Sequence, residues 1–170
     1  MKHQKIINKL SKNRTIFKDL LKDITHEEYL WKWNPDKWCL LEIVCHLFDE
    51  EREDFRTRTK LVLQDPTLPL PPFDPTAWPL DRAYIQQNYN DKVYCLLNER
   101  DQSIDWLQSL KEPKWDNAFQ HPKLGAMSAG LFLANWLAHD YLHLRQILTL
   151  KYKYLEQLSG ESLNYAGCWY

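Results

Sequence analysis

The sequence predicts an all-α fold, a four-helix bundle with one long proline-rich crossover. Apolar residues recur at helical spacing in four long stretches, with charged residues on the opposite faces. Few segments alternate apolar and polar residues with the period of two that marks a β-strand. Six of the nine prolines fall between Pro66 and Pro79, where they separate the second stretch from the third. Four helices with one long connection are typical of a bundle.

Each element is placed by its apolar positions and by its start and stop signals. Helices are expected over residues 3–22, Cys39–Gln64, Asp81–Leu110 and Ser128–Tyr152. Thr25 and Glu28 fit a capping box for a short helix that ends before Asn34 and Pro35. Ser128 is suited to the N-cap of the last helix, because its hydroxyl can accept from a free backbone N–H. The aromatic tail that follows is expected to pack back on the body.

The connections carry the remaining signals. Proline has no backbone N–H, so the segment from Pro66 to Pro79 is expected to be neither helix nor central strand. Two interpretations stay open for it: a plain crossover, or an ordered flap that holds Phe73 and Trp78 over a site. A loop with Pro122 and Gly125 is expected to lead into the last helix.

Size and composition restrict the class of protein. The 170 residues are expected to form a single domain, 1–170, and 44% hydrophobic residues give it a globular core. A net charge of −1 gives no electrostatic reason to expect a nucleic acid or an anionic membrane as a partner. The basic N-terminus lacks the apolar stretch of a secretory signal, and no apolar run is long enough for a membrane span. We therefore expect a cytoplasmic protein that acts on a small molecule.

Two familiar kinds of site are missing from the pattern. The four cysteines, Cys39, Cys45, Cys95 and Cys168, form no CxxC pair, so a cysteine-based zinc site is not expected. The four glycines form no phosphate-binding loop of the GxGxxG or Walker type.

Three histidines are the strongest functional signal. His139 and His143 are spaced i, i+4, so both rings leave one face of the last helix about one turn apart. His46 lies at the edge of the apolar face of the second helix, with Glu50 one turn further on the same side. Three imidazoles on one metal ion would leave a coordination position open, as catalytic sites do. The spacing alone does not show that His46 meets the pair.

Two segments resemble the DinB-like/YfiT-like superfamily. The segment KWCLLEIVCHLFDEE (37–51) is similar to the family's first metal-ligand helix, with a tryptophan before the helix and acidic residues after the histidine. The segment GAMSAGLFLANWLAHDYLHLRQI (125–147) is similar to its last long helix, with an H-x3-H pair followed by Gln-Ile. The order and separation of the two segments match as well. Cys39 departs from the pattern, because Ser or Thr is the more usual N-cap.

The resemblance implies a function. It implies a four-helix bundle, often a homodimer, in which His46, His139 and His143 hold a divalent metal, zinc or nickel. Members of the family include S-transferases that use a low-molecular-weight thiol, so a thiol S-transferase-like enzyme is the leading expectation. A metal-dependent hydrolase and a non-catalytic metal- or ligand-binding protein are the alternatives. Glu50 is expected to act as base or to support a ligand, and Gln146 to orient a ligand ring or the substrate.

Other interpretations of the same residues stay open. The sequence His139-Asp140-x-x-His143 is close to the HExxH motif of metalloproteases, with Asp in place of the general base Glu. The His139-Asp140 pair is also similar to that of the helical HD phosphohydrolases, although His143 would then have no role. Finally, the histidines could be hydrogen-bonded core residues of a metal-free scaffold.

Overall fold

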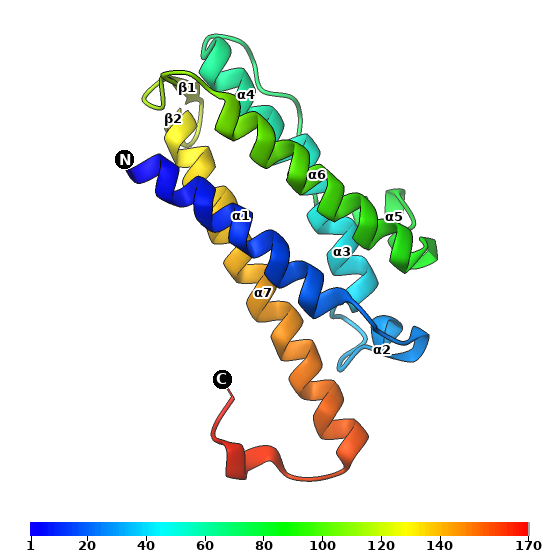
Figure 1. Cartoon of the computed structure of the whole chain (residues 1–170). Coiled ribbons are helices and arrows are strands. Elements are labelled where there is room, and N and C mark those ends of the chain that lie inside the picture. The colour runs from blue at the N-terminus through cyan, green and yellow to red at the C-terminus, as the bar shows by residue number, and fades with distance from the viewer. Residues whose placement is uncertain (170) are drawn as a thin grey trace.

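The computed structural model describes residues 1–169, and four long helices form its body (Figure 1). They are α1 (Lys2–Leu21), a continuous helix made of α3 (Leu40–Asp49), η1 (Glu50–Arg56) and α4 (Thr57–Gln64), α6 (Tyr89–Ser109) and α7 (Ala129–Ser159). Helix α1 packs on α6 and α7, α3 packs on α6, and α4 packs on α7, so the four helices close a ring around one core. The predicted all-α bundle is confirmed.

Shorter elements join these helices. They are α2 (His26–Leu30), α5 (Trp78–Asp81), the 3₁₀ turns η2 (Tyr84–Gln86) and η3 (Leu163–Ala166), and a hairpin of β1 (Ala118–His121) and β2 (Gly125–Ser128). Helix α2 begins as expected, because the Thr25 Oγ1 accepts from the Glu28 N–H at 3.2 Å. Helix α3 is capped by its own third residue, since the Glu42 carboxylate accepts from the Cys39 N–H at 2.9 Å. Cys39 therefore serves at this N-cap position.

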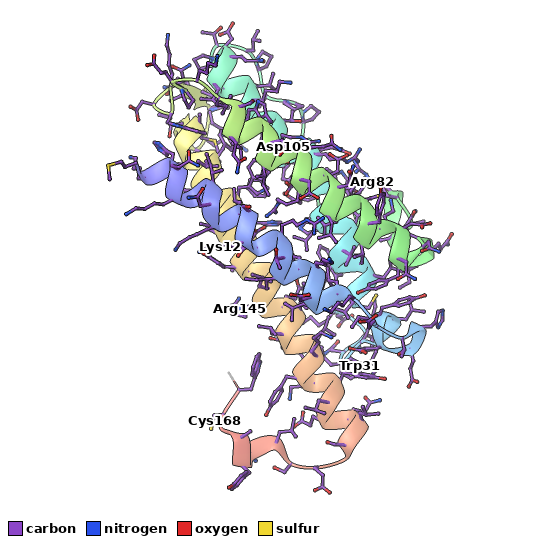
Figure 2. All side chains as sticks on the ribbon, viewed as in Figure 1. Lys12, Trp31, Arg82, Asp105, Arg145 and Cys168 are labelled. Atoms are coloured by element: carbon purple, nitrogen blue, oxygen red, sulfur yellow. The ribbon has the colours of Figure 1, made fainter. Side chains whose placement is uncertain are left out.

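Side chains from all four helices fill the interior of the bundle (Figure 2). One apolar cluster joins α1, α3 and α7 near the end that carries α2, and it includes Phe17, Leu40, Val44 and Ile147. A second cluster, around Trp136, occupies the other half of the bundle. None of the helices within residues 1–169 is long and apolar enough to cross a membrane.

The third bundle helix begins later than expected. The prediction placed its start at Asp81, but α6 starts at Tyr89. Residues before it form α5, whose second residue is Pro79, and then a turn in which Ala83 has a left-handed φ of 45°. The capping signal is Asn88, whose side chain accepts from the Asp91 N–H at 3.0 Å. A proline in the first turn of a helix needs no N–H partner, so α5 can include the end of the proline-rich segment.

The connection into α7 is a hairpin and not the plain loop that was expected. Strand β1 pairs antiparallel with β2, so that Phe119 lies opposite Met127. The turn is held by the His121 ring, whose Nδ1 accepts from the backbone N–H groups of Lys123 and Leu124 at 3.1 Å each. Gly125 follows with a φ of 73°, a conformation that favours glycine.

Helix α7 starts where the sequence predicts and ends later. The Ser128 hydroxyl accepts from the Leu131 N–H at 3.0 Å, which confirms Ser128 as the N-cap. The helix continues to Ser159, seven residues beyond the expected end at Tyr152, and stops at Gly160 in the left-handed conformation. The last turns of α7 extend past the end of α1, and the C-terminal tail then turns back alongside α7 (Figure 1). There the Trp169 ring stacks on Tyr152, with 4.8 Å between ring centroids.

Candidate metal centre

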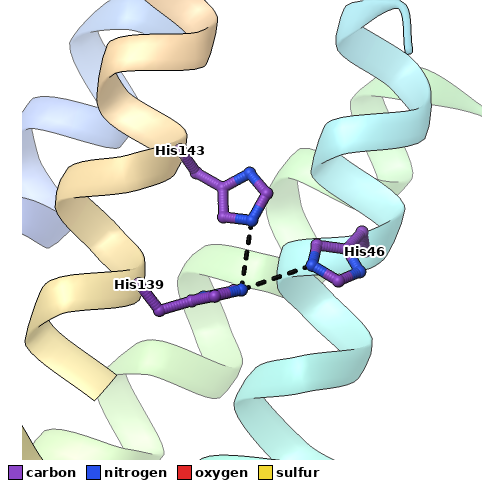
Figure 3. Close-up of side chains that lie close together, drawn as sticks. All are labelled: His46, His139 and His143. Carbon is purple, nitrogen blue, oxygen red and sulfur yellow. Dashed lines mark hydrogen bonds between the residues drawn. The ribbon is translucent and has the colours of Figure 1, made fainter. Parts of the chain in front are cut away.

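The three histidines meet at one point between α3 and α7 (Figure 3). The Nε2 atom of His139 lies 3.3 Å from that of His46 and 3.1 Å from that of His143. In a tetrahedral zinc site with Zn–N bonds of 2.0–2.1 Å, two nitrogen ligands stand about 3.3 Å apart. The spacing of the donor atoms therefore fits a single metal ion.

Hydrogen bonding alone explains this arrangement poorly. The Nε2 of His139 carries at most one proton, so it can form one linear hydrogen bond with only one of its two neighbours. A cation, by contrast, accepts a lone pair from each of the three nitrogens at once. The chemistry of the donor set thus favours a metal over a metal-free core of histidines.

Aromatic side chains enclose the centre. His46 and His143 are 6% and 9% exposed, so the rings are nearly removed from solvent. The Trp38 ring lies over His46, with 4.8 Å between centroids, and the Phe55 ring lies against His139 at 5.0 Å. Trp38 and Phe55 thus cover parts of the His46 and His139 rings with aromatic surface.

Gln146 fixes the orientation of one ring. Its Oε1 lies 2.8 Å from the Nδ1 of His143. An amide oxygen only accepts, so the Nδ1 of His143 carries the proton and its Nε2 presents a lone pair to the centre. The structure thus places Gln146 where the orienting role expected from the sequence requires it.

We expect Gln146→Leu to weaken zinc binding by about 10- to 100-fold, the usual cost of losing the hydrogen-bond partner of a ligand histidine. The measurement is a competition titration against a chromophoric chelator. Gln146→Glu keeps an acceptor at this position and should bind zinc about as tightly as the wild type. Equal losses in the two variants would mean that Gln146 acts through packing alone.

A π-helical segment follows His46 directly. In η1 the wider turn directs Glu50, Glu51, Asp54 and Phe55 into the protein interior. The Thr57 hydroxyl donates to the Arg52 carbonyl, five residues earlier, at 2.6 Å. Such π-helical turns occur often at functional sites. The sequence pattern predicted an uninterrupted α-helix here and gave no sign of this change.

Glu50 is the carboxyl group nearest to the candidate ligands. Its Oε1 lies 3.7 Å from the Nε2 of His46, and the side chain is buried. Burial, followed by repulsion from Asp54, raises the pKa of Glu50 to about 8. A cation bound by the histidines would favour the charged carboxylate and bring this pKa down again. The protonation state of Glu50 should therefore depend on whether the histidines hold a cation.

Burial also keeps the histidines neutral. It is the largest cause that lowers the pKa of His46 from 6.5 to about 3, and it lowers the pKa of His139 and His143 as well. Neutral imidazole is the form that binds a metal. The three rings are thus held in the binding form at pH values where an exposed histidine would be protonated.

This shift predicts how the stability of the metal-free protein depends on pH. Below pH 6.5 the unfolded chain takes up a proton at His46, whereas the folded chain stays neutral down to pH 3 or so. The free energy of unfolding should therefore fall as the pH drops from 6.5, by about 1.4 kcal/mol per pH unit for this histidine. Urea unfolding between pH 6.5 and 4.5 should show a shallower fall for His46→Gln. The exposed His26→Gln should follow the wild type, and an equally steep fall in His46→Gln would contradict the assignment.

A buried polar network lies behind the centre. Arg100 of α6 binds Glu51 through two hydrogen bonds of 2.8 and 2.9 Å, and Asp140 through two of 2.7 Å. Asn13 donates to Asp140, and Trp136 donates to Glu51, both at 2.9 Å. Burial alone would lower the pKa of Arg100, but the two carboxylates raise it above its ordinary value. The network ties η1, α6 and α7 together beside Glu50 and His139.

The position of Asp140 argues against two of the sequence interpretations, the HExxH metalloprotease and the HD phosphohydrolase. Its side chain is fully buried and is held by Arg100 and Asn13. The Asp140 carboxylate is therefore bound on the side away from the centre. In that position it can act neither as the base of an HExxH motif nor as the metal ligand of an HD motif. Sequence reasoning missed Arg100 and Glu51, because their pairing joins two different helices.

Comparison with known proteins identifies the family. The sequence model of the DinB superfamily matches residues 9–147. This chain belongs to the DinB superfamily. The matched range includes all three histidines, and it confirms the resemblance seen in segments 37–51 and 125–147.

One solved structure shows the same fold. YfiT from Bacillus subtilis, described as a probable metal-dependent hydrolase with an unusual four-helix bundle topology, superposes with a TM-score of 0.77. The similarity covers 94% of this chain and 89% of YfiT at 20% sequence identity, so it shows the shared DinB bundle. Among curated proteins, none matches this DinB superfamily chain significantly.

Proposed function

We propose that this protein is a divalent-metal enzyme in which His46, His139 and His143 hold the ion through their Nε2 atoms. The observation that supports this most is the convergence of the three Nε2 atoms, with separations of 3.1 and 3.3 Å from His139. Imidazole ligands suit zinc and nickel, and we propose one of these two as the ion. The description of YfiT as a probable metal-dependent hydrolase agrees with this proposal.

The chemistry follows from the residues around the centre. A divalent ion held by these three histidines would lower the pKa of a bound water to about 7, or would favour the thiolate form of a bound thiol. Glu50 accepts the proton that such a nucleophile loses, because its buried carboxyl group lies 3.7 Å from the Nε2 of His46. Gln146 keeps the His143 ring in place, and Trp38 and Phe55 pack against the rings of His46 and His139.

Water is the nucleophile that we propose first, which makes the protein a hydrolase. The position of Glu50 supports this proposal, because a general base for water must lie close to the metal. The Glu50 carboxyl group is buried and lies 3.7 Å from the Nε2 of His46, a candidate ligand atom. The substrate class is then an ester, an amide or a similar small molecule.

A thiol is the second candidate nucleophile, and a cavity beside His143 favours it. This cavity of about 490 Å³ is lined by His143, Gln146 and two tryptophans, with Lys37 and Arg145 on its walls (Arg145 is labelled in Figure 2). Within residues 1–169 neither cation forms an ion pair. Low-molecular-weight thiols commonly carry carboxylates, which two free cations would attract. This supports the S-transferase-like function expected from the family resemblance.

The test removes the metal and then restores it. Purified protein is treated with a chelator, reloaded with one equivalent of Zn²⁺ or Ni²⁺, and assayed on a panel of esters, amides and thiol acceptors, with and without a thiol. Turnover that appears only with metal and needs no thiol supports hydrolysis, whereas turnover that requires the thiol supports transfer. A metal-loaded protein that is inactive on the whole panel would instead favour a non-catalytic binding protein.

Glu50→Gln separates binding from chemistry in the same assay. The amide preserves the shape of the side chain but cannot accept the proton. We expect the variant to keep its metal and to lose about 100-fold or more in kcat. Unchanged kcat in a metal-loaded variant would exclude Glu50 as the base.

A further inference from the structure

A second, larger cavity lies at the other end of the histidine centre. It has a volume of about 650 Å³, within the range of small-molecule sites, and lies between η1, α4, the proline-rich segment, the hairpin and the start of α7. Its apolar wall includes Leu70, Phe73, Phe119, Met127 and Phe132. Phe119 and Met127 are cross-strand neighbours, so the hairpin presents both side chains to the same space.

The charges in this cavity are already neutralised. The Arg58 guanidinium forms an ion pair with Asp54 and donates to the Pro71 carbonyl at 2.8 Å. The Arg58 group also lies over the Phe73 ring, 5.0 Å from its centroid. Among residues 1–169, Arg58 is the one lysine or arginine on the wall, and it is paired with Asp54, the one carboxylate, so these two groups offer no net charge to an ionic ligand. In this respect it differs from the cavity that carries Lys37 and Arg145.

The inner end of the cavity lies close to the histidine centre. Phe55 lines it and also packs on His139, with 5.0 Å between ring centroids. Asn135 lines it from α7, one helical turn before His139. On the opposite wall, Asp54 follows Glu50 by four residues in η1. The inner end of the cavity is thus separated from the proposed metal ligands by a single layer of side chains.

The proline-rich segment closes the outer side. Pro69 to Phe73 line the cavity, and the Phe73 ring meets Trp78 edge-on at 5.3 Å. Trp78 is in turn covered by the Arg82 guanidinium, 4.2 Å from the ring centroid. The segment thus forms part of the wall of the cavity, with Phe73 lining the space and Trp78 packed against Phe73.

We propose that this cavity binds the uncharged apolar part of the substrate, an aryl or alkyl group, and directs the reacting group toward His139 and Glu50. The part of this proposal that directs the reacting group toward His139 and Glu50 rests on the proposed function. The binding of a neutral apolar group depends on the cavity alone. The experiment below measures the two parts separately.

The test follows a small fluorinated ligand by fluorine NMR. The probes are para-trifluoromethylbenzyl alcohol, which is neutral, and para-trifluoromethylbenzoate, its charged counterpart. Metal-free protein should bind the alcohol about fivefold or more tightly than the benzoate, since burial of an unpaired charge is unfavourable. Met127→Trp fills the cavity and should weaken binding by about tenfold or more, which corresponds to roughly 1.4 kcal/mol.

The matched control is Ala126→Trp, which adds the same ring to the exposed neighbouring position of β2 and should bind the alcohol like the wild type. Leu70→Trp fills the cavity from the proline-rich segment and should repeat the effect of Met127→Trp, so a folding defect in one variant does not decide the result. Equal binding by the wild type and both filled variants, or tighter binding of the benzoate, would overturn the assignment of the cavity.

A paramagnetic ion in the histidine centre tests whether the bound probe lies close to that centre. Protein loaded with Co²⁺ should broaden the fluorine signal of the bound alcohol, and protein loaded with Zn²⁺ should not. A bound probe that Co²⁺ leaves unbroadened would refute the proposed direction of the substrate. A protein that takes up neither ion would instead refute the proposed function, while the binding of the alcohol would still establish the cavity as an apolar site.

Discussion

Replacing His139 by alanine should lower the affinity for Zn²⁺ by about 100-fold or more. This loss exceeds the usual effect of removing only the hydrogen-bond partner of a ligand histidine. The reason lies in the geometry, because the Nε2 of His139 stands between those of His46 and His143 at 3.3 and 3.1 Å. Without it, the two remaining nitrogens belong to different helices and leave half of a tetrahedral ion uncovered. Competition against a chromophoric chelator measures the affinity directly.

His26→Ala is the matched control, since His26 is exposed on α2 and lies outside the centre. Circular dichroism should show that both variants keep the helical content of the wild type. If His139→Ala bound zinc as tightly as His26→Ala, the ion would be held elsewhere, and His139 would be a core residue.

Replacing Arg100 by methionine should destabilise the protein by about 3–5 kcal/mol. Arg100 is 3% exposed and binds two buried carboxylates, Glu51 and Asp140, through four hydrogen bonds of 2.7–2.9 Å. Methionine has a similar volume but leaves both carboxylates buried without a cation, which is the costly way to break such a network. The midpoint and slope of urea unfolding give the change in the free energy of unfolding.

Arg14 provides the control for Arg100. It binds Asp101 with the same two-pronged geometry, at 2.7 and 2.9 Å, and also joins α1 to α6. The Asp101 side chain is 50% exposed, so Arg14→Met should cost no more than about 1 kcal/mol. Similar costs at the two positions would mean that water reaches the inner network, and that it does not hold Glu50 and His139 in place as described above.

The bundle could be predicted because its helices are local. Apolar spacing located all four, and Thr25 and Ser128 marked two helix starts through hydrogen bonds to residues only three positions away. The predicted start of α6 was wrong because no glycine or asparagine marks the left-handed turn at Ala83 in the sequence. The hairpin was missed because each of its strands has four residues, too few for alternation to stand out.

The candidate centre could be predicted only in part. The i, i+4 spacing places His139 and His143 on one face of a helix, but the approach of His46 depends on how α3 packs against α7, and there the prediction depended on family resemblance. The π-helical turn at Glu50 and the pairing of Arg100 with Asp140 depend on tertiary packing, which overrides local preference. These features surround the centre, where the strongest departures from local rules are expected.

The most direct test of the account is the metal content of the purified, untagged protein, measured by elemental analysis beside His46→Ala. His46 is the proposed ligand that comes from α3, so its loss tests whether α3 and α7 meet at one ion. We expect about one zinc or nickel ion per wild-type chain and a large loss of that metal in the variant. A wild-type protein that is empty and takes up no added Zn²⁺ or Ni²⁺ would contradict it and leave a helical bundle with a histidine core.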